Sequence, residues 1–71
     1  MSYDYRKLQG KITEHYGAQS HFSVAMGMSE RSLSLKLNGK IGFKQPEISK
    51  ACELLEIEAA DIPIYFFTQK V

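Results

Sequence analysis

The chain has 71 residues, 44 % of them apolar, and a formal net charge of +1 at pH 7. We therefore expect one domain over residues 1–71, and the apolar content with ordinary charge excludes intrinsic disorder. One cysteine excludes a disulfide framework or paired-cysteine metal site, and no apolar run reaches the ~18 residues of a membrane span, so a cytoplasmic protein is expected.

The first predicted helix covers Asp4–Tyr16. Leu8, Ile12 and Tyr16 recur at a spacing of four residues, which places them on one helix face. Asp4 is suited to cap the N-terminus, and Gly17 is suited to end the helix. The spacing therefore predicts an amphipathic helix with one buried stripe.

Two short helices are predicted next, over residues 19–26 and 29–38. Gly27 ends the first, and Ser29 is a suitable N-cap for the second. Lys36 is expected to point away from the buried stripe of the second helix. The apolar positions of the pair are Phe22, Met26, Leu33 and Leu37.

A fourth helix is predicted over residues 45–55, with Pro46 and Glu47 in its first turn, where a proline and an acidic side chain are favoured. A further short turn is predicted near residues 59–63. The run that follows, residues 64–68, is apolar and β-prone, so an extended tail is expected. The inward positions of the fourth helix are Ile48, Ala51, Cys52 and Leu55.

These elements predict an all-α fold, a compact domain of four to five helices with a short extended C-terminal tail. Eleven apolar positions from every element are expected to form one core. They are Leu8, Ile12, Phe22, Met26, Leu33, Leu37, Phe43, Ile48, Cys52, Leu55 and Ile57.

The charge is unevenly distributed along the chain. Residues 29–50 carry five cations against two carboxylates, whereas residues 51–71 carry one cation against four carboxylates. A molecule with one basic and one acidic end can orient on a polyanion despite a small net charge, although ordinary solvated surfaces can show the same asymmetry. The five cations are Arg31, Lys36, Lys40, Lys44 and Lys50.

Residues 19–38 contain the pattern that points to a function. Two short helices with a brief glycine-containing turn can pack at a steep angle and expose the second as a ridge that fits the major groove of DNA. The stretch Gln19–Lys40 resembles the helix-turn-helix of Cro/repressor-type phage regulators. Its closing Ser-Leu-x-x-Lys-Leu-Asn-Gly-Lys pattern is typical of small Cro-like proteins from phages of Gram-positive bacteria.

The resemblance implies a lambda-repressor-like domain that regulates transcription by binding a double-stranded DNA operator in the bacterial cytoplasm, at the nucleoid. Ala18 and Ser23 depart from the family, which commonly has a capping Thr or Ser and an Ala at these positions. The base-reading residues implied are Glu30, Arg31, Ser34 and Leu35. The phosphate-contacting residues implied are Gln19, Ser29, Asn38, Lys40 and Lys44.

Several of these residues have an alternative role that involves no contact with DNA. Arg31 can grip guanine with two hydrogen bonds or be a plain surface cation. Leu35 can contact a thymine methyl group or complete the core, and Lys40 and Lys44 can bind phosphates or be solvated. His15 and His21 lack further ligands at metal spacing, so no metal or other cofactor is expected.

The sequence also bears on two other functional classes. An enzyme is disfavoured because no phosphate-binding, zinc-protease or nucleophile–base motif is present. A protein-binding antirepressor, which pairs with another phage repressor, is the serious alternative. The near-neutral net charge and Glu30 at the head of the third helix favour it.

The tail predicts a self-association surface. The apolar side chains of this tail are so densely clustered that they are not expected to stay in water. Because alternate side chains of an extended run face opposite directions, they cannot all pack on the core of their own molecule. At least one aromatic is expected in the core, with Phe66 filling the gap between the first and fourth helices. Residues 64–70 are expected to pair across a two-fold axis in a homodimer. The dimerisation residues predicted are Ile64, Tyr65, Phe66 and Phe67.

Overall fold

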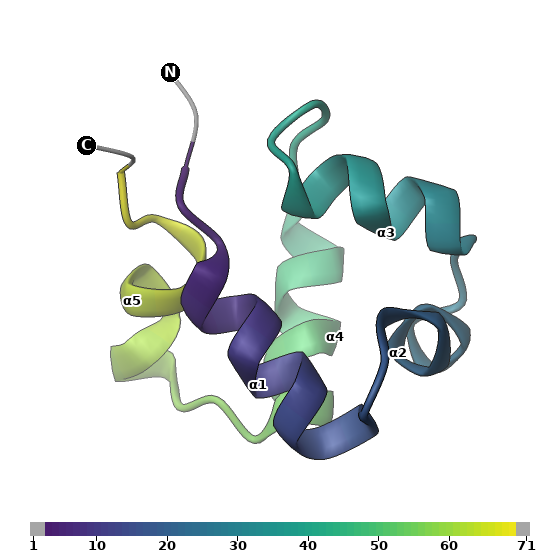
Figure 1. Cartoon of the computed structure of the whole chain (residues 1–71). Coiled ribbons are helices and arrows are strands. Elements are labelled where there is room, and N and C mark those ends of the chain that lie inside the picture. Colours follow the sequence, from purple (N-terminus) through teal and green to yellow (C-terminus); the bar gives the residue numbers. More distant parts are fainter. Residues whose placement is uncertain (1–2, 70–71) are drawn as a thin grey trace.

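Local capping signals set most of the helix boundaries in this chain. A computed structural model describes residues 3–69, which are helical over most of their length and bury one shared core (Figure 1). The all-helical class is therefore confirmed. The elements are α1 (Arg6–Tyr16), α2 (Gln19–Met26), α3 (Glu30–Leu37), α4 (Gln45–Leu55), a 3₁₀ turn (Ala59–Asp61) and α5 (Ile62–Phe66).

The start of α1 lies two residues later than predicted. Asp4 precedes the helix, and its Oδ1 accepts the backbone N–H of Arg6 at 3.0 Å while its Oδ2 binds the Arg6 guanidinium at 2.7 Å. Asp4 thus still accepts a backbone N–H at the N-terminal end of α1, although it lies before the first turn. At the other end Gly17 has a φ of +81°, and its N–H donates to the carbonyl of Thr13 at 2.9 Å, as expected for a helix stop.

Helices α2 and α3 have the predicted boundaries to within one residue. Gly27 adopts the left-handed conformation, with a φ of +74°, and lets the chain turn out of α2. The Ser29 hydroxyl then accepts the backbone N–H of Ser32 at 3.1 Å and caps α3. Figure 1 shows α2 almost end-on where α3 runs across the view, so the two helices cross steeply.

Removing the α3 cap is expected to destabilise the fold. Ser29→Ala leaves an N–H of the first turn without its side-chain acceptor, and such a loss costs about 1 kcal/mol of unfolding free energy. Urea unfolding followed by circular dichroism measures this cost. Ser49→Ala, at an exposed position inside α4, is the matched control, because alanine is the better helix former there. Equal stabilities of the two variants would show that the cap contributes nothing.

The core agrees with most of the predicted positions. Nine of the eleven are buried, whereas Phe43 and Ile48 are only partly buried and pack against the core from outside. Tyr5 and Ala51 join the core although neither is in the predicted list, and Phe66 occupies it as expected. Burial raises the pKa of the Cys52 thiol, so that group is a protonated packing element at neutral pH.

The extended tail predicted over residues 64–68 is wrong for residues 64–66. Ile62–Phe66 form α5, with Pro63 in its first turn, where its fixed φ and missing N–H are tolerated. Figure 1 shows α5 beside α1, with both ends of the chain on one side of the molecule. The chain after Phe67 is tied to the N-terminal segment, because Asp4 N–H donates to the Thr68 carbonyl at 2.7 Å and Tyr3 forms an isolated antiparallel bridge with Gln69. Lys70, the last residue of the predicted dimerisation segment, lies outside the described residues.

Across residues 3–69, no helix has the length and apolar character needed to traverse a bilayer. Over the same range, no three or more His, Cys, Asp or Glu side chains gather as metal ligands would.

Candidate functional site

The outer side of α3 carries the predicted base-reading residues. Glu30 and Arg31 are exposed in its first turn, and Ser34 and Leu35 follow one turn later, each partly buried. Residues spaced by three or four positions share a helix face, so all four can contact one partner surface. The structure thus brings this predicted set together on one ridge.

The predicted phosphate set is more scattered. Gln19 is partly buried at the first position of α2, whereas Asn38, Lys40 and Lys44 are exposed in and around the loop that follows α3. Ser29 is exposed, but its hydroxyl is engaged with both the backbone and the hydroxyl of Ser32. A contact from Ser29 to an external group therefore competes with the α3 cap.

Lys36 does not point away from the core as predicted. Its side chain is only 8 % exposed, and its Nζ lies 3.0 Å from Glu47 Oε1 and 3.1 Å from the Gly42 carbonyl oxygen. The ammonium also lies 5.9 Å from the centre of the Phe43 ring, within the range of a cation–π contact. Lys36 therefore joins α3 to α4 through the loop between them.

The electrostatics of Glu47 follow from this contact. Partial burial raises the pKa of its carboxyl, but the Lys44 backbone N–H, at 2.8 Å, and the Lys36 ammonium more than offset that effect. The net result is a pKa below the usual value, so Glu47 is ionised at neutral pH. One cation and one anion of the basic segment thus neutralise each other inside the fold.

Lys50 is also engaged internally. Its Nζ donates to the carbonyl of Met26 at 3.3 Å, where it satisfies an acceptor at the end of α2. In the described part of the chain, the cations of residues 29–50 that make no ion pair or hydrogen bond through their charged group are Arg31, Lys40 and Lys44. Glu30 partly offsets them. The basic surface is therefore weaker than the sequence suggested.

The predicted dimerisation residues are divided by the helical conformation of α5. Phe66 is 1 % exposed and belongs to the core, so it is unavailable to a partner. Ile64 and Phe67 are exposed, and Tyr65 is partly buried. Strand pairing through residues 64–66 is ruled out in this conformation, because their backbone groups lie in a helix. A homodimer itself stays a prediction.

One exposed residue was missed at the sequence level. Ile41 is 44 % exposed in the loop between α3 and α4, beside Lys40. The sequence offered one clue to this residue. The loop Gly39-Lys-Ile-Gly42 holds an isoleucine between two glycines, and no core position is predicted there. Exposed apolar side chains in a loop of this kind are candidates for partner contact.

The described residues form a small all-helical domain in which Glu30 and Arg31 are exposed on α3. The family model described as "Protein of unknown function (DUF739)" matches residues 1–69. The chain belongs to this family. No curated protein matches the sequence.

A solved structure gives a closer comparison. The chain is 58 % identical to the modulator of repression (MOR) of the temperate bacteriophage TP901-1 from Lactococcus lactis, whose solution structure is known. The alignment covers 100 % of this chain and 96 % of that protein, with a TM-score of 0.83. The likeness therefore extends over the whole fold.

Proposed function

We propose that this protein is a phage regulator that modulates repression by binding a repressor protein. The observation that carries the proposal is the 58 % identity, over the full chain, to a phage modulator of repression. Identity at this level over an entire small domain favours a shared type of partner. The antirepressor alternative weighed from the sequence is thus preferred to direct operator binding.

The charge distribution supports a protein partner. Lys and Arg side chains that neutralise phosphates supply much of the affinity of a protein for DNA. Around α3 this chain offers Arg31, Lys40 and Lys44, because Lys36 is paired with Glu47 and Lys50 donates to Met26. Three cations partly offset by Glu30 are few for a polyanion but ordinary for the polar rim of a protein interface.

The exposed side of α3 is the surface we assign to the repressor. Leu35 supplies a partly exposed apolar centre, and Glu30 and Arg31 supply charges of both signs beside it. An apolar centre with a mixed polar rim is the usual anatomy of a protein interface. The sequence predicted that this face reads a DNA operator. We propose instead that it recognises a protein.

Calorimetric titration of the repressor encoded in the same phage genome into the purified protein tests the proposal. We expect saturable binding, which Arg31→Ala and Leu35→Ala weaken by about tenfold or more, as expected for contacts near an interface centre. Ser49→Ala, on the exposed side of α4, is the control and is expected to bind as the parent protein does. Absence of binding at micromolar concentrations would reject the proposal.

Operator binding remains the second candidate, and the exposed Arg31 in the first turn of α3 favours it. If DNA is the partner, Arg31→Ala costs ~1–3 kcal/mol and relaxes preference at one base pair, whereas Lys40→Ala weakens all sequences alike and lowers the salt slope by about one unit. Gel-shift assays across a salt series measure both. We expect no sequence-dependent shift, and a sequence-specific complex with a steep salt dependence would favour DNA.

A further inference from the structure

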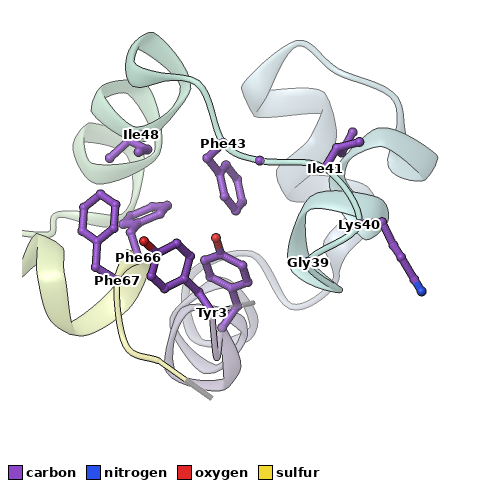
Figure 2. Close-up of a pocket in the computed structure, with 10 residues that line it drawn as sticks. Tyr3, Gly39, Lys40, Ile41, Phe43, Ile48, Phe66 and Phe67 are labelled. Atoms are coloured by element: carbon purple, nitrogen blue, oxygen red, sulfur yellow. The ribbon is translucent and has the colours of Figure 1, made fainter. Parts of the chain in front are cut away.

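A pocket with aromatic walls opens between the two ends of the chain and the α3–α4 loop. Tyr3, Phe66 and Phe67 lie on one side of it and residues 39–42 on the other, with Phe43 between them (Figure 2). The rings meet edge to face, with centroids 5.7 Å apart for Tyr3–Phe67 and 5.3 Å apart for Phe43–Phe66. We name this feature the aromatic pocket.

The volume of the aromatic pocket limits the size of the group that it can hold. Its volume is about 250 Å³. Sites for drug-sized ligands and cofactors typically have volumes of ~300–1,000 Å³ and enclose most of the ligand, so this pocket falls just below their usual range. One aliphatic or aromatic side chain of another polypeptide fits the space, in the manner of an interface anchor.

The rim of the aromatic pocket gathers three of the five large apolar side chains that are exposed among the described residues. Tyr3, Ile41 and Phe67 are all large apolar side chains that are more than a third exposed, and all three line the pocket. Their positions are fixed: the Tyr3 and Phe67 segments are joined by the Asp4–Thr68 hydrogen bond, and the loop is held by Lys36. The surface is therefore preformed and needs little ordering on binding.

The charge at the rim gives the chemistry of the partner. Lys40 is the charged residue that lines the pocket, no carboxylate does so among the described residues, and Lys44 follows in the same loop. Figure 2 shows the Lys40 side chain extending from the rim away from the rings, and because this side chain is exposed, long and flexible, its ammonium can meet a group bound beside the opening. A carboxylate next to the inserted apolar side chain would complement it.

We propose that the aromatic pocket is a second protein-docking site, which takes an apolar side chain flanked by carboxylates from a partner polypeptide. It lies beside the α3 face, with Lys40 at the border of the two surfaces, and its occupant does not depend on the partner assigned to that face. Burial of one leucine-sized side chain between aromatic walls supplies the affinity, and the rim lysine selects an acidic neighbour. Binding of a single isolated segment is then weak and gains strength in a larger interface.

Nuclear magnetic resonance titration of the full chain tests the proposal. The probe is the peptide acetyl-Glu-Leu-Leu-Glu-amide, and the matched control is acetyl-Lys-Leu-Leu-Lys-amide. We expect the acidic peptide to shift the resonances of Ile41, Phe43 and Phe67 with a Kd on the order of millimolar, and to bind about fivefold more tightly than the basic one. Lys40→Glu is expected to reverse this preference, whereas Lys7→Glu, exposed on α1 and outside the pocket, is expected to preserve it.

Three results would overturn the proposal. The first is no shift at these residues up to ~10 mM peptide. The second is a charge preference that Lys40→Glu and Lys7→Glu change equally, because the rim lysine would then have no special role. The third is a set of concentration-dependent shifts at the same residues without peptide, because the occupant would then be a second copy of this chain.

Discussion

Phe66→Ala is expected to lower the free energy of unfolding by about 3–5 kcal/mol. The ring is 1 % exposed and packs edge to face on Phe43, so its removal leaves a cavity that the rigid helices around it cannot close. A domain of 71 residues is expected to have about 4–10 kcal/mol of stability in total. The variant should therefore be partly or wholly unfolded at 37 °C, as circular dichroism melting would show.

The adjacent residue provides the control. Phe67 is 47 % exposed and contacts Tyr3 edge to face, so Phe67→Ala is expected to cost less than about 1 kcal/mol. Phe66→Leu keeps most of the buried volume and is expected to fold with a loss of about 1–2 kcal/mol, which keeps the measurement possible if the alanine variant fails to fold. Similar losses for Phe66→Ala and Phe67→Ala would contradict the division between core and surface.

These variants also separate the two roles predicted for the tail. If a homodimer forms through the exposed Ile64 and Phe67, Phe67→Ala shifts the sedimentation of the protein at tens of micromolar with little effect on its melting temperature. Phe66→Leu should do the reverse. Unchanged sedimentation of Phe67→Ala, with a monomeric parent protein, would remove the dimer prediction.

The helix positions could be predicted because the signals that set them are local. Gly17 and Gly27 end α1 and α2 through positive φ values, and Ser29 caps α3 through its own hydroxyl. Each signal acts within four residues of the boundary it fixes. The apolar stripe at a spacing of three to four residues then identified the inward face of each helix.

The parts that could not be predicted depend on distant contacts. Lys36 looks like a surface cation from its neighbours in sequence, and only the approach of Glu47 and Gly42 makes its burial favourable. The β-prone tail likewise became helical because α5 packs on α1, which outweighs the weak intrinsic preference of its residues. Of the α3 residues predicted to contact a partner, Glu30 and Arg31 are exposed and Ser34 and Leu35 are partly buried, whereas the identity of a partner is not encoded in helical spacing.

Glu47→Gln is expected to cost about 2–3 kcal/mol at neutral pH. The change keeps the shape of the side chain but leaves the buried Lys36 ammonium with the Gly42 carbonyl and the Phe43 ring as its neighbours. Breaking a fully buried ion pair costs about 3–5 kcal/mol, and the smaller figure reflects the Glu47 side chain, which is 24 % exposed. Urea unfolding at pH 7 measures the loss.

A double-mutant cycle separates the ion pair from the packing. Lys36→Met keeps the aliphatic stem and removes the charge, so it is expected to cost about 1 kcal/mol or less. The double variant Lys36→Met/Glu47→Gln is expected to be more stable than Glu47→Gln alone, since no ammonium is then buried without its carboxylate. Strict additivity of the two single changes would show that the contact contributes no coupling.

The same contact predicts a dependence on pH. The pKa of Glu47 is lower in the folded protein than its usual value of 4.5, so the ionised carboxylate contributes its full stabilisation above that value and loses it as the pH falls through the lower folded pKa. The stability difference between the parent protein and Glu47→Gln is therefore expected to be constant from pH 7 to about pH 5 and to shrink toward pH 3. Glu53→Gln, at an exposed position of α4, should show no comparable change. A gap between the parent protein and Glu47→Gln that stays constant down to pH 3 would mean that the carboxylate charge does not stabilise the fold.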